Sequence, residues 1–191
     1  MDATSSHRSL MWCVFTALIV ATSASASRAD EKQAVERLAK RGVRIFRDPA
    51  GNAKHAIFPK WATNEDLALL KDCSQFEVLI LGGTKITDDG LKNLVGLTRL
   101  NALWLADTKI TDDGLKHLRM LRNMRWLDLH GTKIQGPGLQ HLDGLIMLRR
   151  LELTSTAVKE TGINRLLRVL PACEVIHDDR IISKLRRINQ E

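Results

Sequence analysis

Two sets of side chains in this chain have the composition of a hydrolytic site. Asp107, His130 and Ser155 supply an acid, a base and a hydroxyl, the groups that nucleophilic catalysis combines. Asp128 and Glu152 lie 24 residues apart (152 minus 128), and paired carboxylates act as general acid and base in many hydrolases. No nucleophile elbow or phosphate loop accompanies either set, so a solvated polar face explains them better and no catalytic residue is predicted.

A second set of side chains is suited to binding. The chain has only 4% aromatic residues and no Tyr, so its Trp residues stand out, and exposed Trp beside arginines and carboxylates is typical of an interface hot spot. The alternative is that these Trp only cover a short sheet or pack against a flanking cap. The predicted binding residues are Trp104, Arg125, Trp126, Asp128, His130, Arg149, Arg150 and Glu152.

A repeat of fixed length must position these side chains. The phrase TKITDDGLK occurs at residues 84–92 and again at 108–116, a shift of 24. Four units starting at Phe76 follow one another without gaps, and the same columns extend back into a degraded unit (52–75) and forward into residues 172–177. In the degraded unit we expect Ile57, Leu67, Leu70 and Cys73 to take the apolar places. A fixed short period indicates a solenoid, in which each unit buries its apolar face against its neighbours.

The apolar columns predict a strand and a helix in each unit. Leu79 and Leu81 alternate with variable residues, which predicts a short strand with one buried face, and Leu91 and Leu94 are spaced as on one face of a short helix. The same columns recur every 24 residues, so the strands of successive units are expected to form a parallel sheet.

The polar columns predict how each turn is closed. Thr84 is expected to bond the backbone of adjacent turns, and Thr87 is placed as a helix N-cap with Asp88 and Asp89 in the first turn of its own helix. Gly90 holds a column where a side chain would crowd the next turn. Because helix capping already accounts for the doubled aspartates and the EF-hand spacing is missing, no metal site is predicted.

These units resemble leucine-rich repeats, written LxxLxLxxT followed by xITDxGLxxL, of the kind found in predicted exported bacterial proteins. They are also similar to the cysteine-containing repeats attached to F-box adaptors, although Thr replaces the usual Asn or Cys and no F-box-like segment precedes them. The resemblance covers residues 52–177. It implies an α/β fold, a right-handed solenoid with a parallel concave sheet and short convex helices, and a protein-binding role.

The first 29 residues have the order of a secretory signal. Arg8 precedes an apolar run of 12 residues (10–21), and small residues follow up to Ala29. The run is shorter than the roughly 20 residues of a membrane span. The prediction is therefore a secreted or periplasmic protein with cleavage after Ala26 or Ala29, and the alternative is a membrane anchor at residues 10–21.

The remaining segments are expected to cap the solenoid. Residues 30–51 are predicted to form a helix followed by a hairpin, and residues 178–191 a capping helix with a basic face. A basic amphipathic helix for membranes or acidic partners is the alternative for the C-terminal segment. Cys73 and Cys173 are about four turns apart, roughly 20 Å at the spacing of stacked strands, so no disulfide is expected between them.

The function predicted from the sequence is a non-catalytic module that binds a protein or peptide on the concave face, with no cofactor. The net charge of +7 favours acidic partners, but no nucleic-acid-binding pattern is present. A structural or self-associating envelope protein is the first alternative and a hydrolase the second.

Overall fold

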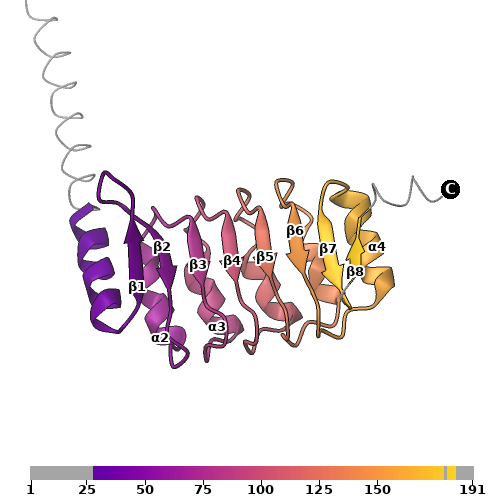
Figure 1. Cartoon of the computed structure of the whole chain (residues 1–191), viewed down its shortest axis with the longest axis horizontal. Helices are drawn as coiled ribbons and strands as arrows, with labels where there is room; N and C mark the ends of the chain where they lie inside the picture. The colour runs from indigo at the N-terminus through magenta and orange to yellow at the C-terminus, as the bar shows by residue number, and fades with distance from the viewer. Residues whose placement is uncertain (1–27, 179, 184–191) are drawn as a thin grey trace, which may run out of the picture.

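Eight strands form one sheet in which the order in space follows the order in the chain (Figure 1). The structure is a computed structural model that describes residues 28–178 and 180–183. β2 to β7 pair in parallel, while β1 pairs with β2, and β8 with β7, in antiparallel fashion. The strands are β1 (Arg44–Arg47), β2 (Ala53–Ile57), β3 (Val78–Ile80), β4 (Ala102–Trp104), β5 (Trp126–Asp128), β6 (Arg150–Glu152), β7 (Glu174–His177) and β8 (Arg180–Ile182).

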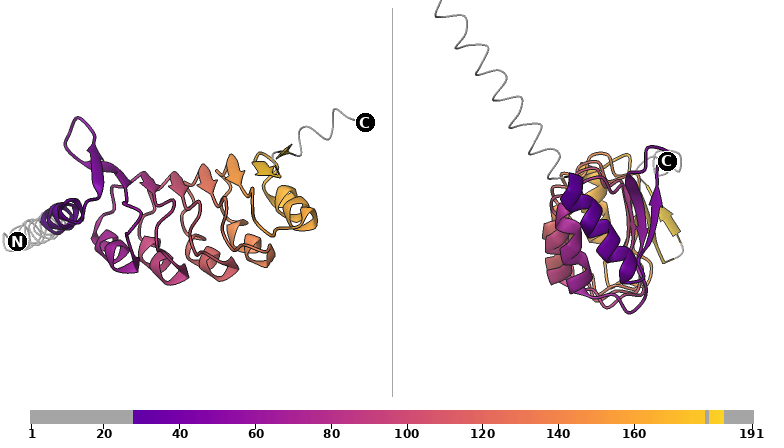
Figure 2. Two further views of the ribbon diagram at one scale, coloured as in Figure 1. Left: turned by 60° about the horizontal axis from the view of Figure 1, so that its bottom comes forward. Right: turned by 90° about the vertical axis from the view of Figure 1, so that its left-hand side faces the viewer.

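Short helices line one side of the sheet and leave its opposite side uncovered by helices (Figure 2). A helix over residues 28–40 opens the described part of the chain. The later ones are α2 (Asn64–Leu67), η1 (Ala68–Asp72), α3 (Asp88–Leu91), η2 (Lys92–Leu94), η3 (Asp112–His117), η4 (Pro137–Leu142) and α4 (Glu160–Val169), where η marks a 3-10 helix. Each unit therefore runs from strand to helix and back, which is the predicted solenoid of parallel strands and short helices.

One continuous core lies between the two layers, and it confirms the predicted apolar columns. Leu79, Leu103, Leu127 and Leu151 are in register across β3 to β6 and are fully buried. The helix-column leucines are buried against them. Since no single unit could bury both its strand and its helix faces, the stacking of units supplies the stabilising burial of apolar area.

Side chains of three successive units bind the start of the next unit's helix, and we call this set of bonds the carboxylate ladder. It is formed by the carboxylates of Asp88 and Asp112, with the amide of Asn64 in the first place. Asp88 accepts hydrogen bonds from the backbone N–H and the hydroxyl of Thr111 at 2.9 and 2.7 Å. Asp112 accepts from the backbone N–H groups of Gln135, Gly136 and Gly138. Thr87 and Thr111 occupy the predicted N-cap positions, and of the two hydroxyls Thr111 accepts a backbone N–H of its own helix, from Asp113, while Thr87 does not. Asp88 and Asp112 act between repeats rather than within their own helix.

The glycine column fits against this ladder. A Cβ on Gly90 would lie 2.5 Å from Asn64 Oδ1, and one on Gly114 would overlap Asp88 Oδ1. The crowding is thus with the preceding turn, not the next one. A Cβ on Gly162 would meet no atom closer than 3.8 Å, because Gly136 occupies the ladder position of the preceding unit and has no side chain.

The threonine column closes each turn internally. Thr84 Oγ1 donates to the carbonyl oxygen of Leu81 at 2.6 Å, and Thr108, Thr132 and Thr156 make the same bond three residues back. The predicted bond to adjacent turns was wrong for this hydroxyl. The bond satisfies a carbonyl at the end of each strand, where the backbone leaves the sheet.

The degraded unit departs from the 24-residue spacing. Ala56 pairs with Leu79, a shift of 23 (79 minus 56), whereas Leu67 and Leu70 keep the helix-column places and are buried. One residue is therefore missing between strand and helix. Ala56 and Phe58 are buried and Ile57 is half-buried beside Ile80, so the predicted place of Ile57 in the core was wrong.

The C-terminal end also differs from the prediction. Residues 180–182 form β8 and pair with β7, so this part of the predicted capping helix (178–191) is a strand; residues 184–191 lie outside the described part of the chain. Cys173 is fully buried although its column is variable in the other units. Cys73 and Cys173 are both free, buried thiols, as expected from their separation.

The described helices are all short. None of them is long and apolar enough to cross a membrane. The predicted signal segment (1–29) lies outside the described residues apart from Arg28 and Ala29, which belong to the first helix.

Candidate functional site

The concave face is the exposed face of strands β2 to β7, opposite the helices. Its side chains form two rows in register. One row contains Ala102, Trp126, Arg150 and Glu174, and the other contains Trp104, Asp128, Glu152 and Ile176. The strand periodicity of two places both rows on the same side because the buried leucines alternate with them.

The predicted binding residues come from three consecutive units. Trp104, Trp126, Asp128, Arg150 and Glu152 lie on the strands themselves. Arg125 and Arg149 immediately precede β5 and β6, and His130 follows β5. The structure therefore brings the aromatic residues and both carboxylates into the middle of the concave face, with two arginines at the N-terminal edge and the histidine at the C-terminal edge.

The two tryptophans contact one another. Their ring centroids are 5.7 Å apart, with the ring planes tilted by 33°, which is within the range of favourable aromatic pairs. Trp126 is 37% exposed and Trp104 is half-buried. The guanidinium carbon of Arg150 lies 4.9 Å from the centroid of the Trp126 ring, so a cation–π contact holds this arginine against the aromatic pair.

The two carboxylates are engaged by their own turns. Asp128 accepts the backbone N–H of His130 at 2.9 Å. Glu152 accepts the backbone N–H of Thr154 at 3.0 Å and also the Thr154 hydroxyl. Burial raises the pKa of Asp128 above its ordinary value; the His130 N–H opposes this, and the nearby charges of Glu152 and Asp107 add to it.

The arginines of the site have no carboxylate partner. The ion pairs in the described part of the chain are Arg41–Asp66, Lys54–Glu77, Lys92–Asp89, Arg165–Asp143 and His177–Asp178. Arg149 donates to the carbonyls of Ile146 and Leu148. Arg150 Nε is buried without a hydrogen-bond partner, which is an energetic cost unless a ligand supplies one.

The rows continue onto the N-terminal hairpin, which the sequence prediction did not include. Ile57 pairs with Ile80 and His55 with Val78, and across the hairpin Phe46 pairs with His55. Phe46 is 44% exposed. The one-residue deletion in the degraded unit hid this continuation, because a fixed spacing of 24 assigns Ile57 to the core.

The backbone conformation explains the residue types at two positions of the hydrolase alternative, Asp107 and Ser155. Asp107 and Ser155 have φ values of 55° and 58°, and Gly83 and Gly131 occupy the same column with φ values of 68° and 63°. This column is a left-handed corner at the end of each strand, a conformation open to Gly and to short polar residues. In the described part of the chain, no hydrogen bond joins the side chains of Asp107, His130 and Ser155.

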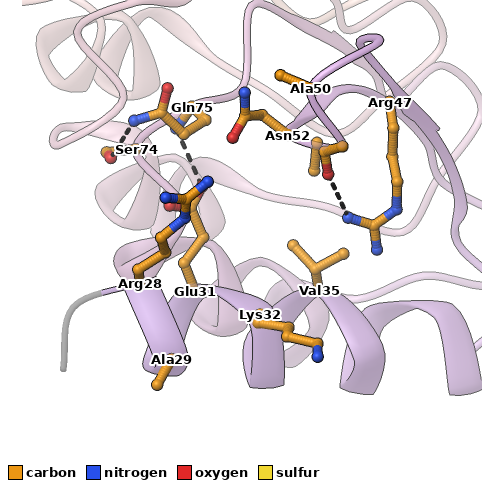
Figure 3. Close-up of a pocket in the computed structure, with 12 residues that line it drawn as sticks. Arg28, Ala29, Glu31, Lys32, Val35, Arg47, Ala50, Asn52, Ser74 and Gln75 are labelled. Atoms are coloured by element: carbon orange, nitrogen blue, oxygen red, sulfur yellow. Dashed lines mark hydrogen bonds between the residues drawn. The ribbon is translucent and has the colours of Figure 1, made fainter. Parts of the chain in front are cut away.

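A cavity of about 820 Å³ lies at the N-terminal end, between the first helix and the hairpin (Figure 3). Arg28, Lys32 and Arg47 bring three positive charges to it, and all three side chains are exposed. Arg47 donates to the carbonyl of Gly51 at 3.0 Å, and Glu31 accepts the Gln75 N–H at 3.3 Å. The first bond closes the loop of the hairpin, and the second ties the helix to the first turn of the solenoid.

A second cavity, of about 800 Å³, lies where the carboxylate ladder ends. Gln135, Gly136 and Pro137 line one side, and Lys159 and Gly162 line the other. The absence of a ladder side chain at Gly136 leaves this junction less filled. Among the described residues, no group of three or more His, Cys, Asp or Glu could hold a metal ion.

Comparison with known proteins identifies the repeat. A family model described as "Leucine Rich repeat" matches residues 73–95. The SNF/U2A′ complex of Drosophila melanogaster contains a similar chain, with a TM-score of 0.55, 22% identity, and coverage of 77% of this chain and 84% of that one. No curated protein sequence matches significantly. The chain thus has the fold of leucine-rich-repeat proteins, with one repeat matched at residues 73–95.

Two internalins of Listeria monocytogenes share this fold. Internalin C2 matches with a TM-score of 0.50 and 24% identity over 58% of this chain and 45% of that chain. A second internalin, inlF, matches with a TM-score of 0.50 and 20% identity over 56% of this chain and 30% of that one. The matched region thus spans less than half of either internalin, and at these identities the likeness describes the fold alone.

Proposed function

We propose that this chain is a non-catalytic module that binds a protein or peptide on its concave face. The observation that carries the proposal is the Trp104–Trp126 pair in the middle of that face, where Trp126 is 37% exposed. Large aromatic side chains that stay partly in water on a repeat surface are the typical anchors of interfaces. The leucine-rich-repeat fold and the half-exposed Ile57 and Ile80 beside the pair support the same face.

Alanine substitution of both Trp residues tests this proposal. The variant Trp104→Ala with Trp126→Ala should lose the partner that the parent captures from a native envelope extract. Trp61→Ala is the matched control, since Trp61 is 50% exposed and is not on the concave strands. Equal capture by all three proteins would remove the concave face as the binding surface.

Self-association through the end of the solenoid is a second candidate. β1 is an edge strand, and Phe46 on it is 44% exposed. Exposed strand edges pair readily with other chains. Arg44 stacks on the Phe46 ring at 5.8 Å, and such flanking charge opposes edge pairing. Light scattering of the parent and of Phe46→Asp separates the two candidates, because only self-association through this edge predicts an oligomer that the variant loses.

We also infer that the protein is exported, with the first residues acting as a secretory signal. The support is the order of Arg8, the apolar run 10–21 and the small residues after it. Cleavage after Ala26 would retain all the described helical residues 28–40, whereas cleavage after Ala29 would remove Arg28 and Ala29. Mass spectrometry of the protein from its native source distinguishes these two ends from an uncleaved anchor.

A further inference from the structure

The structure assigns an acidic peptide segment to the concave face: we propose that Arg150 and Arg125 receive an Asp or Glu side chain whose neighbouring apolar residue packs on Trp104 and Trp126. This inference rests on the proposed function and names the chemistry of the partner. The concave face carries both arginines and carboxylates, so its partner could be acidic or basic. The inference is that the partner is acidic.

The guanidinium of Arg150 is already fixed in place. It stacks on Trp126 at 4.9 Å, the side chain is half-buried, and its Nε is buried without a hydrogen-bond partner. A stacked, immobilised guanidinium loses little side-chain entropy when it binds a carboxylate, and it offers two parallel N–H donors. An incoming carboxylate would therefore gain a charge-assisted contact at a low ordering cost.

Two carboxylates of the face, Asp128 and Glu152, are bonded to the protein's own backbone. Asp128 and Glu152 hold the N–H groups of His130 and Thr154 through Oδ1 and Oε1, and these bonds fix both carboxylates at the strand ends. Glu174 is the register neighbour of Arg150 on β7, and the two form no ion pair. Next to the tryptophan pair, the charged side chain already held in position for an opposite charge is thus Arg150.

Arg125 adds a second free cation next to the first. It is exposed, and its carbonyl accepts the backbone N–H groups of both Arg149 and Arg150 at 2.9 and 3.0 Å. The backbones of these three arginines are therefore neighbours at the N-terminal edge of β5 and β6. The net charge of +7 also attracts an acidic partner at long range.

The ligand is a side chain within a continuing peptide rather than a chain end. Arg150 lies on β6 with β5 on one side and β7 on the other, so strands extend in both directions from the contact point. The apolar row formed by Ile57, Ile80 and Trp104 leads away from the arginines toward the hairpin. A peptide that crosses the strands would place its acidic residue at Arg150 and its apolar residues along this row.

Selection from a random twelve-residue peptide library displayed on phage tests this inference. The baits are the full-length parent, Trp104→Ala with Trp126→Ala, and Arg150→Gln. We expect clones that depend on the Trp pair to be enriched in Asp or Glu beside an apolar residue. A synthetic peptide from the best clone, with an amidated C-terminus, should lose at least about tenfold in affinity on Arg150→Gln or when its acidic residue is replaced by the amide.

The outcomes separate this inference from the proposed function. Trp-dependent clones enriched in Lys or Arg, or an affinity unchanged by Arg150→Gln, would overturn the acidic partner and leave the binding module standing. The absence of Trp-dependent clones would count against both. If Arg150→Gln does not fold by circular dichroism, Arg125→Gln and the acid-to-amide change in the peptide carry the test, since neither alters the stacked guanidinium.

Discussion

Asp88 in one repeat accepts both the backbone N–H and the hydroxyl of Thr111 in the next, at 2.9 and 2.7 Å. A carboxylate of one turn thus satisfies the first free donors of the following helix, which has no earlier turn of its own to bond them. The first Asp of the repeated phrase TKITDDGLK therefore serves the contact between two units. The contact is part-buried, so its loss should be measurable.

Asp88→Ala is predicted to destabilise the protein by about 1–2 kcal/mol, the usual cost of losing a side-chain cap. Asp89→Ala is the matched control, because Asp89 is the exposed neighbour that bonds only Lys92 in its own turn. Urea unfolding followed by circular dichroism measures both. Equal midpoints for the two variants would show that the contact between repeats adds no stability.

Gly114→Ala is predicted to destabilise by about 1–3 kcal/mol, the range for overpacking a filled site. The new Cβ would overlap Asp88 Oδ1, so the ladder must shift. Gly96→Ala, with no atom within 4 Å of the added Cβ, should leave the midpoint near that of the parent. In the double variant Asp88→Ala with Gly114→Ala, the total loss should be smaller than the sum of the two single losses, because Asp88→Ala removes the oxygen that the new Cβ at position 114 would strike.

The charge of Asp128 is predicted to make the protein less stable as pH rises. Since burial holds its folded pKa above 3.8, the folded state binds this proton more tightly than the unfolded state, and the resulting stability is lost as pH climbs from 3.8 through the raised value. Asp128→Asn should therefore gain stability relative to the parent between about pH 3 and about pH 7. Chemical unfolding of both proteins at each pH checks this; a difference that shrinks toward neutrality would contradict it.

Cys73 and Cys173 are predicted to resist alkylation in the folded protein. Burial raises the pKa of both Cys73 and Cys173 to about 12, so at pH 8 only about one thiol in ten thousand is a thiolate, the reactive form. Iodoacetamide should label neither residue in buffer and both in denaturant, as read by peptide mass spectrometry. Rapid labelling of Cys173 alone would place the C-terminal turn outside the packed core.

The hydrophobic columns were predictable because a buried strand and a buried helix face each impose their own spacing. Trp104, Trp126, Asp128, Arg150 and Glu152 could be assigned to one face for the same reason. The repeat pattern does not show to which turn a polar side chain bonds. Asp88 has the same neighbours in the sequence whether it caps its own helix or the next one.

Departures from the period were the other source of error. The missing residue before Leu67 moved Ile57 out of the core and joined the hairpin to the concave face. The apolar spacing of Ile181 and Ile182 suits a helix, but pairing with β7 satisfies their backbone groups in a strand. Both features depend on a neighbouring element, so the local pattern does not reveal them.

The end of the carboxylate ladder at Gly136 gives the array an internal seam. Units up to that point are linked by bonds that all run in one direction, from each helix start to the following one, while α4 beyond the seam begins at Glu160 and its N-cap Lys159 makes no side-chain cap bond. The last turn and the strands beyond it are held by sheet pairing, apolar contact and the Arg165–Asp143 ion pair, without a ladder bond. Amide protons of α4 should accordingly exchange as a separate block, ahead of those in the turns that the ladder ties together.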